Sequence, residues 1–182
     1  MRSLRKLLVL FALACSALGA SAQVPPERFY LVGAAGRTQY DYDCWDYWYD
    51  CASARSTAWK VGAGWRFGIF GLEGWYMDFG SADIYPAPDQ LRLRAAVFNA
   101  VWYLPLAPNL EGLLRAGIAD VRHERSRDAD QSTFAGTFGL GLVLTVVPAV
   151  AVEFAWDVTG GEGTYSGSTT ANALSVGLRV RF

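Results

Sequence analysis

Hydrophobic and polar residues alternate one by one in several stretches of the chain. In residues 174–182, Leu, Val and Phe occupy every second position, and Ser, Gly and Arg occupy the positions between them. Residues 58–67 repeat the pattern, with large apolar side chains on one face and Lys60, Arg66 and two glycines on the other. A period of two residues is typical of a β-strand, whose successive side chains point to opposite faces.

Eight segments of this kind follow one another, and each is near the length of a tilted strand that crosses a membrane. The connections between them are alternately long and short, which is the pattern of a membrane barrel with short periplasmic turns and long extracellular loops. We therefore predict an all-β fold, an eight-stranded antiparallel transmembrane β-barrel. The predicted strands are residues 29–40, 57–67, 70–80, 91–103, 110–121, 133–145, 150–158 and 171–182. Short turns are expected at 68–69, 105–109 and 146–149, and long loops at 41–56, 81–90, 122–132 and 159–170.

Charged residues in the predicted strands share the parity opposite to the bulky apolar residues. A charge that faces lipid costs about 2–4 kcal/mol at the membrane midplane, so we expect these side chains to face inward and to form ion pairs. The interior of an eight-stranded barrel is just wide enough for side chains to fill it. The pattern thus predicts a closed ionic interior. The predicted network comprises Lys60, Arg66, Glu73, Arg92, Arg94, Glu111, Arg115, Glu153, Asp157 and Arg179, with Arg37 and Arg181 on the same parity.

Glycines and aromatic residues add to this picture. Gly62, Gly64, Gly139 and Gly141 fall on the interior parity, where they make room for Arg and Trp side chains. Aromatic residues near strand ends fit the girdles at the two lipid–water boundaries of a barrel. The alternative is that these aromatic residues fill the core of a soluble sandwich or barrel. The candidates for the girdles are Trp59, Trp65, Phe67, Tyr76, Tyr103, Trp156 and Phe182.

The first 22 residues have the composition of a secretory signal peptide. Three cations precede an apolar run that ends at Leu18, and Ala20, Ser21 and Ala22 supply the small residues of a cleavage site. A lipoprotein signal ending at Cys15 is the alternative. Removal of residues 1–22 leaves one domain, residues 23–182, with 13 Lys and Arg against 17 Asp and Glu and hence a net charge of −4. This balance excludes the basic surface that nucleic-acid binding requires.

Composition and cysteine content exclude further classes of protein. The chain is 52% hydrophobic and only 18% charged, which excludes intrinsic disorder. No apolar stretch after residue 22 approaches the roughly 18 to 20 residues of a spanning helix. Cys44 and Cys51 form an even pair in a secreted chain, so we expect a disulfide that closes a short loop.

This first outer loop is acidic and aromatic. Its aromatic residues Trp45, Tyr47, Trp48 and Tyr49 lie between the two cysteines, and rigid aromatic side chains dominate binding hot spots. One hypothesis is a surface-binding loop for an extracellular ligand. The other is that the aromatic rings rest at the headgroup boundary while the disulfide protects the loop from proteolysis. The four aspartates nearby do not have the spacing of a known calcium loop.

Catalytic and metal-binding residues are poorly represented. One histidine and two bridged cysteines cannot build a metal centre, and we expect no cofactor. His123 lies near Glu124 and Ser126 in the third long loop, but a nucleophilic serine needs a base that the fold orients. We interpret this segment as a solvated loop. A functional variant of this interpretation is that its arginines contact lipopolysaccharide phosphates.

Two segments resemble the OmpA-like and opacity-protein group of small outer-membrane barrels. Residues 72–80, Leu-Glu-Gly-Trp-Tyr-Met-Asp-Phe-Gly, are similar to the third-strand motif of that group. The last strand, with Ser175, Gly177, Val180 and Phe182, is similar to its terminal assembly signal. The resemblance implies an eight-stranded barrel in a Gram-negative outer membrane, with both termini in the periplasm. It also implies contact with outer-membrane lipid and lipopolysaccharide, and insertion by the barrel assembly machinery through the C-terminal strand.

These observations favour a non-enzymatic protein with a structural or adhesin-like role at the cell surface. Two alternatives remain open at this point. One is an enzyme that modifies lipid A, which requires a serine, a histidine and an acid to converge on the lipid-facing wall. The other is a narrow channel for ions or small solutes.

Overall fold

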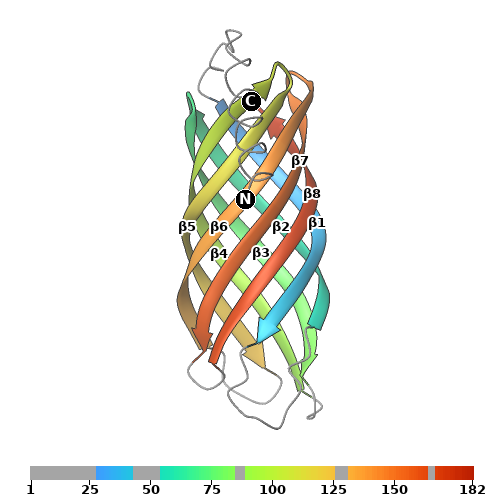
Figure 1. The fold of residues 1–182 in the computed structure, drawn as a ribbon, viewed down its shortest axis with the longest axis vertical. Helices are drawn as coiled ribbons and strands as arrows, with labels where there is room; N and C mark the ends of the chain where they lie inside the picture. The colour runs from blue at the N-terminus through green and yellow to red at the C-terminus, as the bar shows by residue number, and fades with distance from the viewer. Residues whose placement is uncertain (1–27, 43–53, 85–88, 126–130, 164–166) are drawn as a thin grey trace, which may run out of the picture.

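The computed structural model describes residues 28–42, 54–84, 89–125, 131–163 and 167–182, and these residues form eight strands (Figure 1). The strands are β1 (Arg28–Tyr42), β2 (Ala54–Phe67), β3 (Phe70–Ile84), β4 (Asp89–Ala107), β5 (Leu110–Arg125), β6 (Gln131–Val147), β7 (Val150–Gly163) and β8 (Gly167–Arg181). All eight lie where the alternation of apolar and polar residues predicts them.

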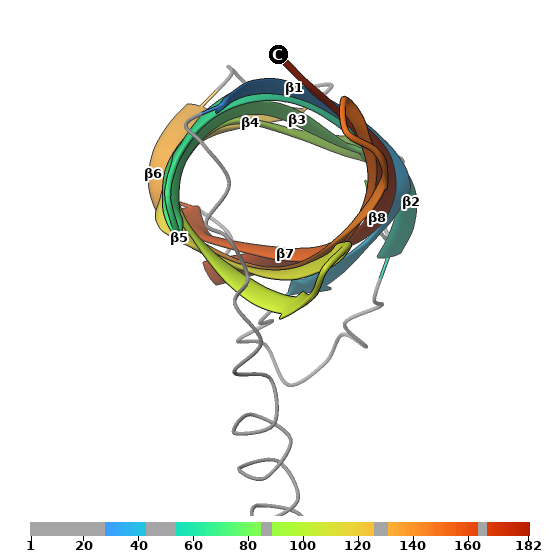
Figure 2. The same cartoon turned by 90° about the horizontal axis from the view of Figure 1, so that it is seen from above.

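Each strand pairs antiparallel with the next, and β8 pairs with β1, so the sheet closes into a barrel. Viewed along its axis, the barrel forms a complete ring (Figure 2). β1 joins the two ends of the sheet, with Gly33 opposite Val61 of β2 and Leu178 of β8. A closed sheet leaves no strand edge, so every strand satisfies its backbone hydrogen bonds within the barrel, as lipid requires. The predicted eight-stranded antiparallel barrel is confirmed.

Three connections of two residues lie at one end of the barrel, which we call the turn end. They are Gly68–Ile69, Pro108–Asn109 and Pro148–Ala149, between pairs of strands whose pairing continues up to the turn. Gly68 has a φ of 67°, a left-handed conformation that favours glycine in a tight turn. The amide of Phe182 donates to the carbonyl of Phe29, which places the last residue at this end as well. The opposite end is called the loop end.

Most strands extend further than the alternation predicts, and two of the three turns are correspondingly shorter, while the turn at residues 68–69 is as predicted. β4, predicted over residues 91–103, runs from Asp89 to Ala107. Its pairing with β5 continues past Pro105 by a register shift between Pro105 and Ala107. A proline lacks the backbone N–H for a ladder hydrogen bond, but a bulge tolerates it, so Pro105 does not end the strand.

A belt of large apolar side chains surrounds the outside of the barrel. Trp65 and Ile118 are each 59% exposed and Leu174 is 67% exposed, and every strand contributes exposed apolar residues of this kind. Towards the loop end the outward positions become polar, with Arg37, Arg55 and Arg122 exposed. Soluble proteins do not expose a continuous apolar belt, whereas transmembrane barrels cover one with lipid. None of the described segments forms a helix long and apolar enough to cross a membrane.

Six of the seven aromatic residues predicted to lie on the outer face do so. The prediction for Tyr103 is wrong, because this residue is 1% exposed and points inward. Its neighbour Trp102 is exposed on the outside. The reason is the strict alternation along β4, where Val101 and Tyr103 are both buried and the residues between and beside them face out. The six exposed aromatic residues are Trp59, Trp65, Phe67, Tyr76, Trp156 and Phe182.

An arginine in the middle of the apolar belt should destabilise the barrel far more than one near the loop end. Leu140 is exposed midway along β6, and Ser132 is exposed on the same face of β6 near the loop end. Because the guanidinium would lie in hydrocarbon, we expect Leu140→Arg to lower the free energy of unfolding by about 2–4 kcal/mol, and Ser132→Arg by about 0–1 kcal/mol. Urea unfolding of both variants in lipid vesicles measures the difference. Equal losses would show that lipid does not cover this face.

Candidate functional site

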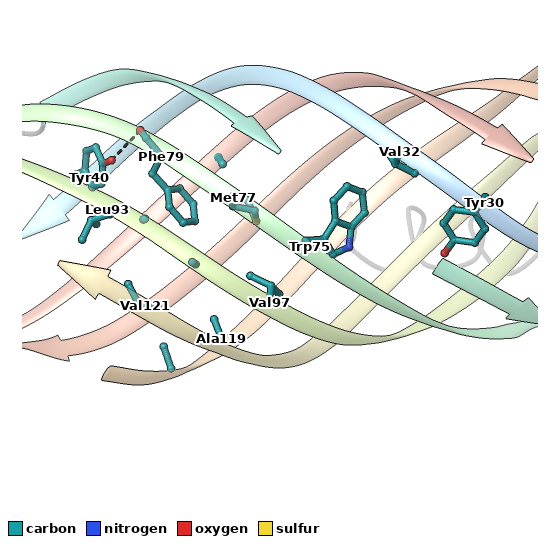
Figure 3. Packing of buried hydrophobic residues seen from close by; sticks show 14 residues of the cluster. Tyr30, Val32, Tyr40, Trp75, Met77, Phe79, Leu93, Val97, Ala119 and Val121 are labelled. Carbon is teal, nitrogen blue, oxygen red and sulfur yellow. Dashed lines mark hydrogen bonds between the residues drawn. The ribbon is translucent and has the colours of Figure 1, made fainter. Parts of the chain in front are cut away.

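The barrel interior has two chemically different halves. Towards the loop end it is lined by apolar side chains, among them Met77, Phe79, Leu93 and Val121, which point inward in Figure 3. In this half the hydroxyl of Tyr40 donates to the carbonyl of Phe79 over 2.8 Å. From the middle towards the turn end the interior is charged. The charged half is the candidate functional site.

Four charged side chains meet in the middle of the barrel, and we call them the central ion cluster: Glu73 of β3, Arg115 of β5, Glu153 of β7 and Arg179 of β8. Arg115 donates from Nε to Glu73 Oε2 over 2.6 Å and from Nη2 to Glu153 Oε1 over 2.7 Å. Arg179 donates from Nη2 to Glu153 Oε2 over 2.7 Å and to Glu73 Oε1 over 2.9 Å. Each arginine thus bridges both carboxylates, and all four residues are 1% exposed.

Two aromatic residues complete the hydrogen bonding of Glu73, and a third connects them to Arg179. The hydroxyl of Tyr30 donates to Glu73 Oε1 over 2.6 Å, and the indole N–H of Trp75 donates to Glu73 Oε2 over 3.0 Å. Tyr103 lies 2.6 Å from the Tyr30 hydroxyl and accepts a hydrogen bond from Arg179 Nη1 over 3.1 Å. The Arg179 guanidinium also lies over the Tyr30 ring at 4.1 Å. These contacts satisfy buried groups that would otherwise be costly to remove from water.

A third ion pair lies beside the cluster on the side of the loop end. Lys60 Nζ is 2.5 Å from Asp157 Oδ2 and 3.8 Å from Glu153 Oε1, and it lies 4.5 Å from the centre of the Trp75 ring. Asp157 Oδ1 is also 3.7 Å from Arg115 Nη1. With this pair the middle of the barrel holds three cations and three anions. Buried charges require such pairing, because an unpaired ion in a low-dielectric interior is strongly destabilising.

A smaller group of charges lies at the turn end. Arg66 Nη1 is 2.7 Å from Glu111 Oε1, and Arg181 Nη2 is 3.4 Å from Glu111 Oε2. Arg66 also donates to the carbonyl of Gly68 over 2.8 Å, and its guanidinium lies over the Tyr103 ring at 4.1 Å. These contacts connect the turn-end group to the central ion cluster through Tyr103.

Interior glycines make room for the large side chains of the cluster. A Cβ on Gly62 would come within 2.8 Å of the Trp75 ring, and one on Gly139 would come within 2.5 Å of Asp157 Oδ1. A Cβ on Gly64 would overlap the ring of Tyr30. Each of these glycines lies opposite the residue in question on the neighbouring strand, so glycine allows the aromatic or charged side chain to lie over that strand.

Two arginines of the predicted interior network lie elsewhere. Arg92 and Arg94 have side chains 44% and 31% exposed, whereas Leu93 between them is buried inside the barrel. The expectation that they face inward is therefore wrong, as is the same expectation for Arg37, which is exposed. The alternation on β4 follows the apolar lining of the loop-end half, so leucine takes the inward position and arginine the outward one.

The outward arginines of β4 still form ion pairs. Arg92 Nη2 is 2.5 Å from Asp78 Oδ2, and Arg94 Nη1 is 2.6 Å from Glu124 Oε1. Asp78 also accepts a hydrogen bond from the amide of Gly80 over 2.9 Å, at a register shift between Asp78 and Ser81. Gly80 has a φ of 80°, which the bulge requires. This group lies towards the loop end.

Several predicted residues lie outside the described part of the chain. They are the signal peptide, the cysteines Cys44 and Cys51, and the loop residues Trp45, Tyr47, Trp48 and Tyr49; the side chain of His123 is not described either. Of the residues assigned to the assembly signal, Val180 and Phe182 are exposed on the outer face, and Gly177 lies on the inner one. Among the described residues, no group of His, Cys, Asp or Glu side chains has the arrangement of a metal site.

The sequence patterns missed Tyr30, Trp75, Tyr103 and Arg28 as interior residues. Aromatic residues occur on both faces of the barrel, so residue type alone does not separate them. Parity along each strand does: Trp75 is two residues from Glu73, and Tyr30 has the same parity as Val32 and Thr38, which are buried.

The sequence matches no protein-family model and no curated protein. The structure is similar to solved outer-membrane barrels. Neisserial surface protein A aligns with a TM-score of 0.71 at 18% identity, over 85% of this chain and 97% of that one. Ail, the attachment invasion locus protein of Yersinia pestis, solved with the heparin analogue sucrose octasulfate, gives 0.55 at 13% identity over 86% and 98%. The N-terminal barrel domain of Pseudomonas aeruginosa OprF gives 0.53 at 15% identity over 85% and 97%. The chain therefore has the fold of small eight-stranded outer-membrane barrels.

Loss of the Glu73 charge should destabilise the barrel strongly. Glu73→Gln leaves Arg115 and Arg179 with Glu153 as their nearest carboxylate, so we expect the free energy of unfolding to fall by about 3–5 kcal/mol. The matched control is Glu124→Gln, which breaks a half-exposed pair with Arg94 and should cost less than about 1 kcal/mol. Denaturant titration of both variants, followed by tryptophan fluorescence, measures the two losses. Similar small losses in both would show that Glu73 does not balance the buried arginines.

Proposed function

We propose that this chain is an integral protein of a Gram-negative outer membrane, with a barrel that is closed to solutes and with outer loops that carry its interactions. The observation that carries the proposal is the central ion cluster, in which Glu73, Arg115, Glu153 and Arg179 meet across the barrel from four different strands.

The closure argument rests on geometry and on charge. The cluster joins β3, β5, β7 and β8 by hydrogen bonds of 2.6 to 2.9 Å, so its side chains span the interior between these strands. A solute could pass only if these ion pairs separated. Removing one partner of a buried pair costs about 3–5 kcal/mol, and here each charge contacts two opposite charges. The barrel is thus better suited to a structural or surface role than to conduction.

The loop end is the side we assign to the cell exterior. This orientation places the outward arginines Arg37, Arg55 and Arg122 at the level of the outer headgroups, where they can contact lipopolysaccharide phosphates. For the aromatic segment between Cys44 and Cys51, which connects β1 and β2 at this end, we propose a disulfide and an adhesin-like binding role. Ail is an attachment invasion locus protein whose structure holds a heparin analogue, and a surface-binding role for the present loop is of the same kind.

The final strand is the segment we assign to recognition by the barrel assembly machinery. Val180 and Phe182 are exposed on its outer face, and the Phe182 ring lies 6.1 Å from the ring of Phe29. An aromatic residue at the turn end is accessible before the barrel closes, because β8 pairs with β1 only when the sheet is complete. This accessibility supports the assignment of Gly177, Val180 and Phe182 to the assembly signal.

Purified, folded protein should produce no stepwise ionic current in a planar lipid bilayer. The reason is that the paired side chains of the central ion cluster fill the interior. Together with Lys60 and Asp157, these side chains have a net charge of zero. Bilayer conductance measures this directly, and protein from the same preparation kept unfolded in urea serves as the control for contaminating channels. Reproducible steps that require the folded protein would identify a narrow channel instead.

Cells with and without this protein should yield the same lipid A mass spectrum. The described residues place Glu124 in an ion pair with Arg94 on the outer face, which leaves this carboxylate engaged and unsuited to orient a catalytic base. Mass spectrometry of lipid A from the two outer membranes tests the non-enzymatic assignment. An acyl chain or headgroup gained or lost only in the presence of the protein would overturn it.

A further inference from the structure

A small cavity of about 20 Å³ lies at the turn end and is lined by Arg28, Tyr30, Arg66, Arg179 and Arg181. Tyr30 and Arg179 are buried and form its inner wall, while Arg28 is half-exposed. Four of the five lining residues are arginines. A cavity with this lining attracts anions, and its size admits about one oxygen atom of a group that sits in the barrel mouth.

The strand register brings like charges together at this cavity. Arg28 of β1 lies directly opposite Arg66 of β2, and Tyr30 of β1 lies directly opposite Arg181 of β8. Like charges at directly opposed positions of a sheet destabilise it. Three arginines on three neighbouring strands therefore carry a cost that a bound anion would offset.

The carboxylates described at this end do not balance these cations. Glu111 contacts both Arg66 and Arg181, at 2.7 and 3.4 Å, and Arg179 is neutralised by Glu73 and Glu153 in the central ion cluster. Arg28 donates to the carbonyl of Pro148 over 3.3 Å, which adds no negative charge. Among the described residues the group formed by Arg28, Arg66, Arg181 and Glu111 thus has a net charge of +2.

The guanidinium groups of Arg66 and Arg181 are held in place, and all three arginines retain unused donors. The ring of Tyr103 and the carbonyl of Gly68 fix Arg66, and Arg181 donates from Nη1 to Thr145 Oγ1 over 3.0 Å. Within the described part of the chain, Arg66 Nη2, Arg181 Nε and two nitrogens of Arg28 have no hydrogen-bond acceptor. Donors that are fixed in advance lose little entropy when they bind a ligand.

We propose that the turn-end mouth, formed by Arg28, Arg66 and Arg181, is a binding site for a phosphate group. Guanidinium groups match the oxygens of phosphate in geometry and charge, and the surplus of two positive charges attracts both inorganic phosphate and the single negative charge of a phosphodiester headgroup. The mouth lies beside the end of the apolar belt, at the level of lipid headgroups. The phosphate therefore comes from free phosphate or from a phospholipid headgroup.

The test uses the folded, full-length protein in dodecyl maltoside micelles, which contain no phosphate. Isothermal titration calorimetry measures binding of two probes, inorganic phosphate and the soluble short-chain lipid dihexanoylphosphatidylglycerol. Arg28→Gln removes a half-exposed arginine that lies outside the central ion cluster, so the variant should fold. We expect it to weaken binding at least about tenfold, the effect of losing one charge-assisted hydrogen bond. The matched control is Arg92→Gln, which alters an exposed arginine on the outer face of β4, away from the turn end, and should leave the affinity unchanged.

The two probes separate the two sources of phosphate. Binding of inorganic phosphate that Arg28→Gln weakens supports a site for a free phosphate group. Binding of the short-chain lipid alone, weakened by the same substitution, supports a site for a phospholipid headgroup. The proposal is overturned if neither probe binds, if Arg28→Gln binds as tightly as the unaltered protein, or if Arg92→Gln weakens binding equally.

Discussion

Every charge of the central ion cluster depends on an opposite charge, because the interior between eight strands is filled by side chains and admits little water. Glu73 and Glu153 each accept hydrogen bonds from both Arg115 and Arg179. This arrangement ties four strands together at the middle of the barrel. The same constraint explains the residues around the cluster. Tyr30 and Trp75 supply the remaining donors to Glu73, and Gly62 and Gly64 make room for their rings.

The outer surface follows from a second constraint, the absence of water in lipid. Backbone groups find partners only in a closed sheet, and side chains on the outer face must be apolar over the thickness of the hydrocarbon. The two constraints act on alternate residues of the same strands. On β2, for example, Lys60 and Arg66 face the ion pairs while Trp59 and Trp65 face outward. This alternation is the strongest signal in the sequence, and it explains why all eight strands could be predicted.

Other features could not be predicted, for reasons that particular residues make clear. Alternation shows which residues of a strand share a face, but it does not show which face is the inner one. On β4, Leu93 faces inward and its neighbouring arginines face outward, because the loop-end interior is apolar. Tyr103 has the amphipathic character of a boundary residue, and only its place on β4 shows that its hydroxyl serves the ion cluster. The connectivity of the ion pairs depends on the stagger between distant strands, as for Lys60 of β2 and Asp157 of β7. The alternation within one strand contains no such information.

The unequal distribution of charge along the axis separates two roles of the interior. In the middle, Lys60, Arg115 and Arg179 are balanced by three carboxylates, and such a balanced cluster stabilises one arrangement of the strands. At the turn end, Glu111 is the one side-chain carboxylate among the residues described there, and it contacts Arg66 and Arg181 but not Arg28. If the interior served only to stabilise the barrel, we would expect a second carboxylate or fewer arginines at this end. The surplus of cations therefore sets the turn-end mouth apart from the rest of the interior, and an anion from outside the chain is the partner that its charge and register require.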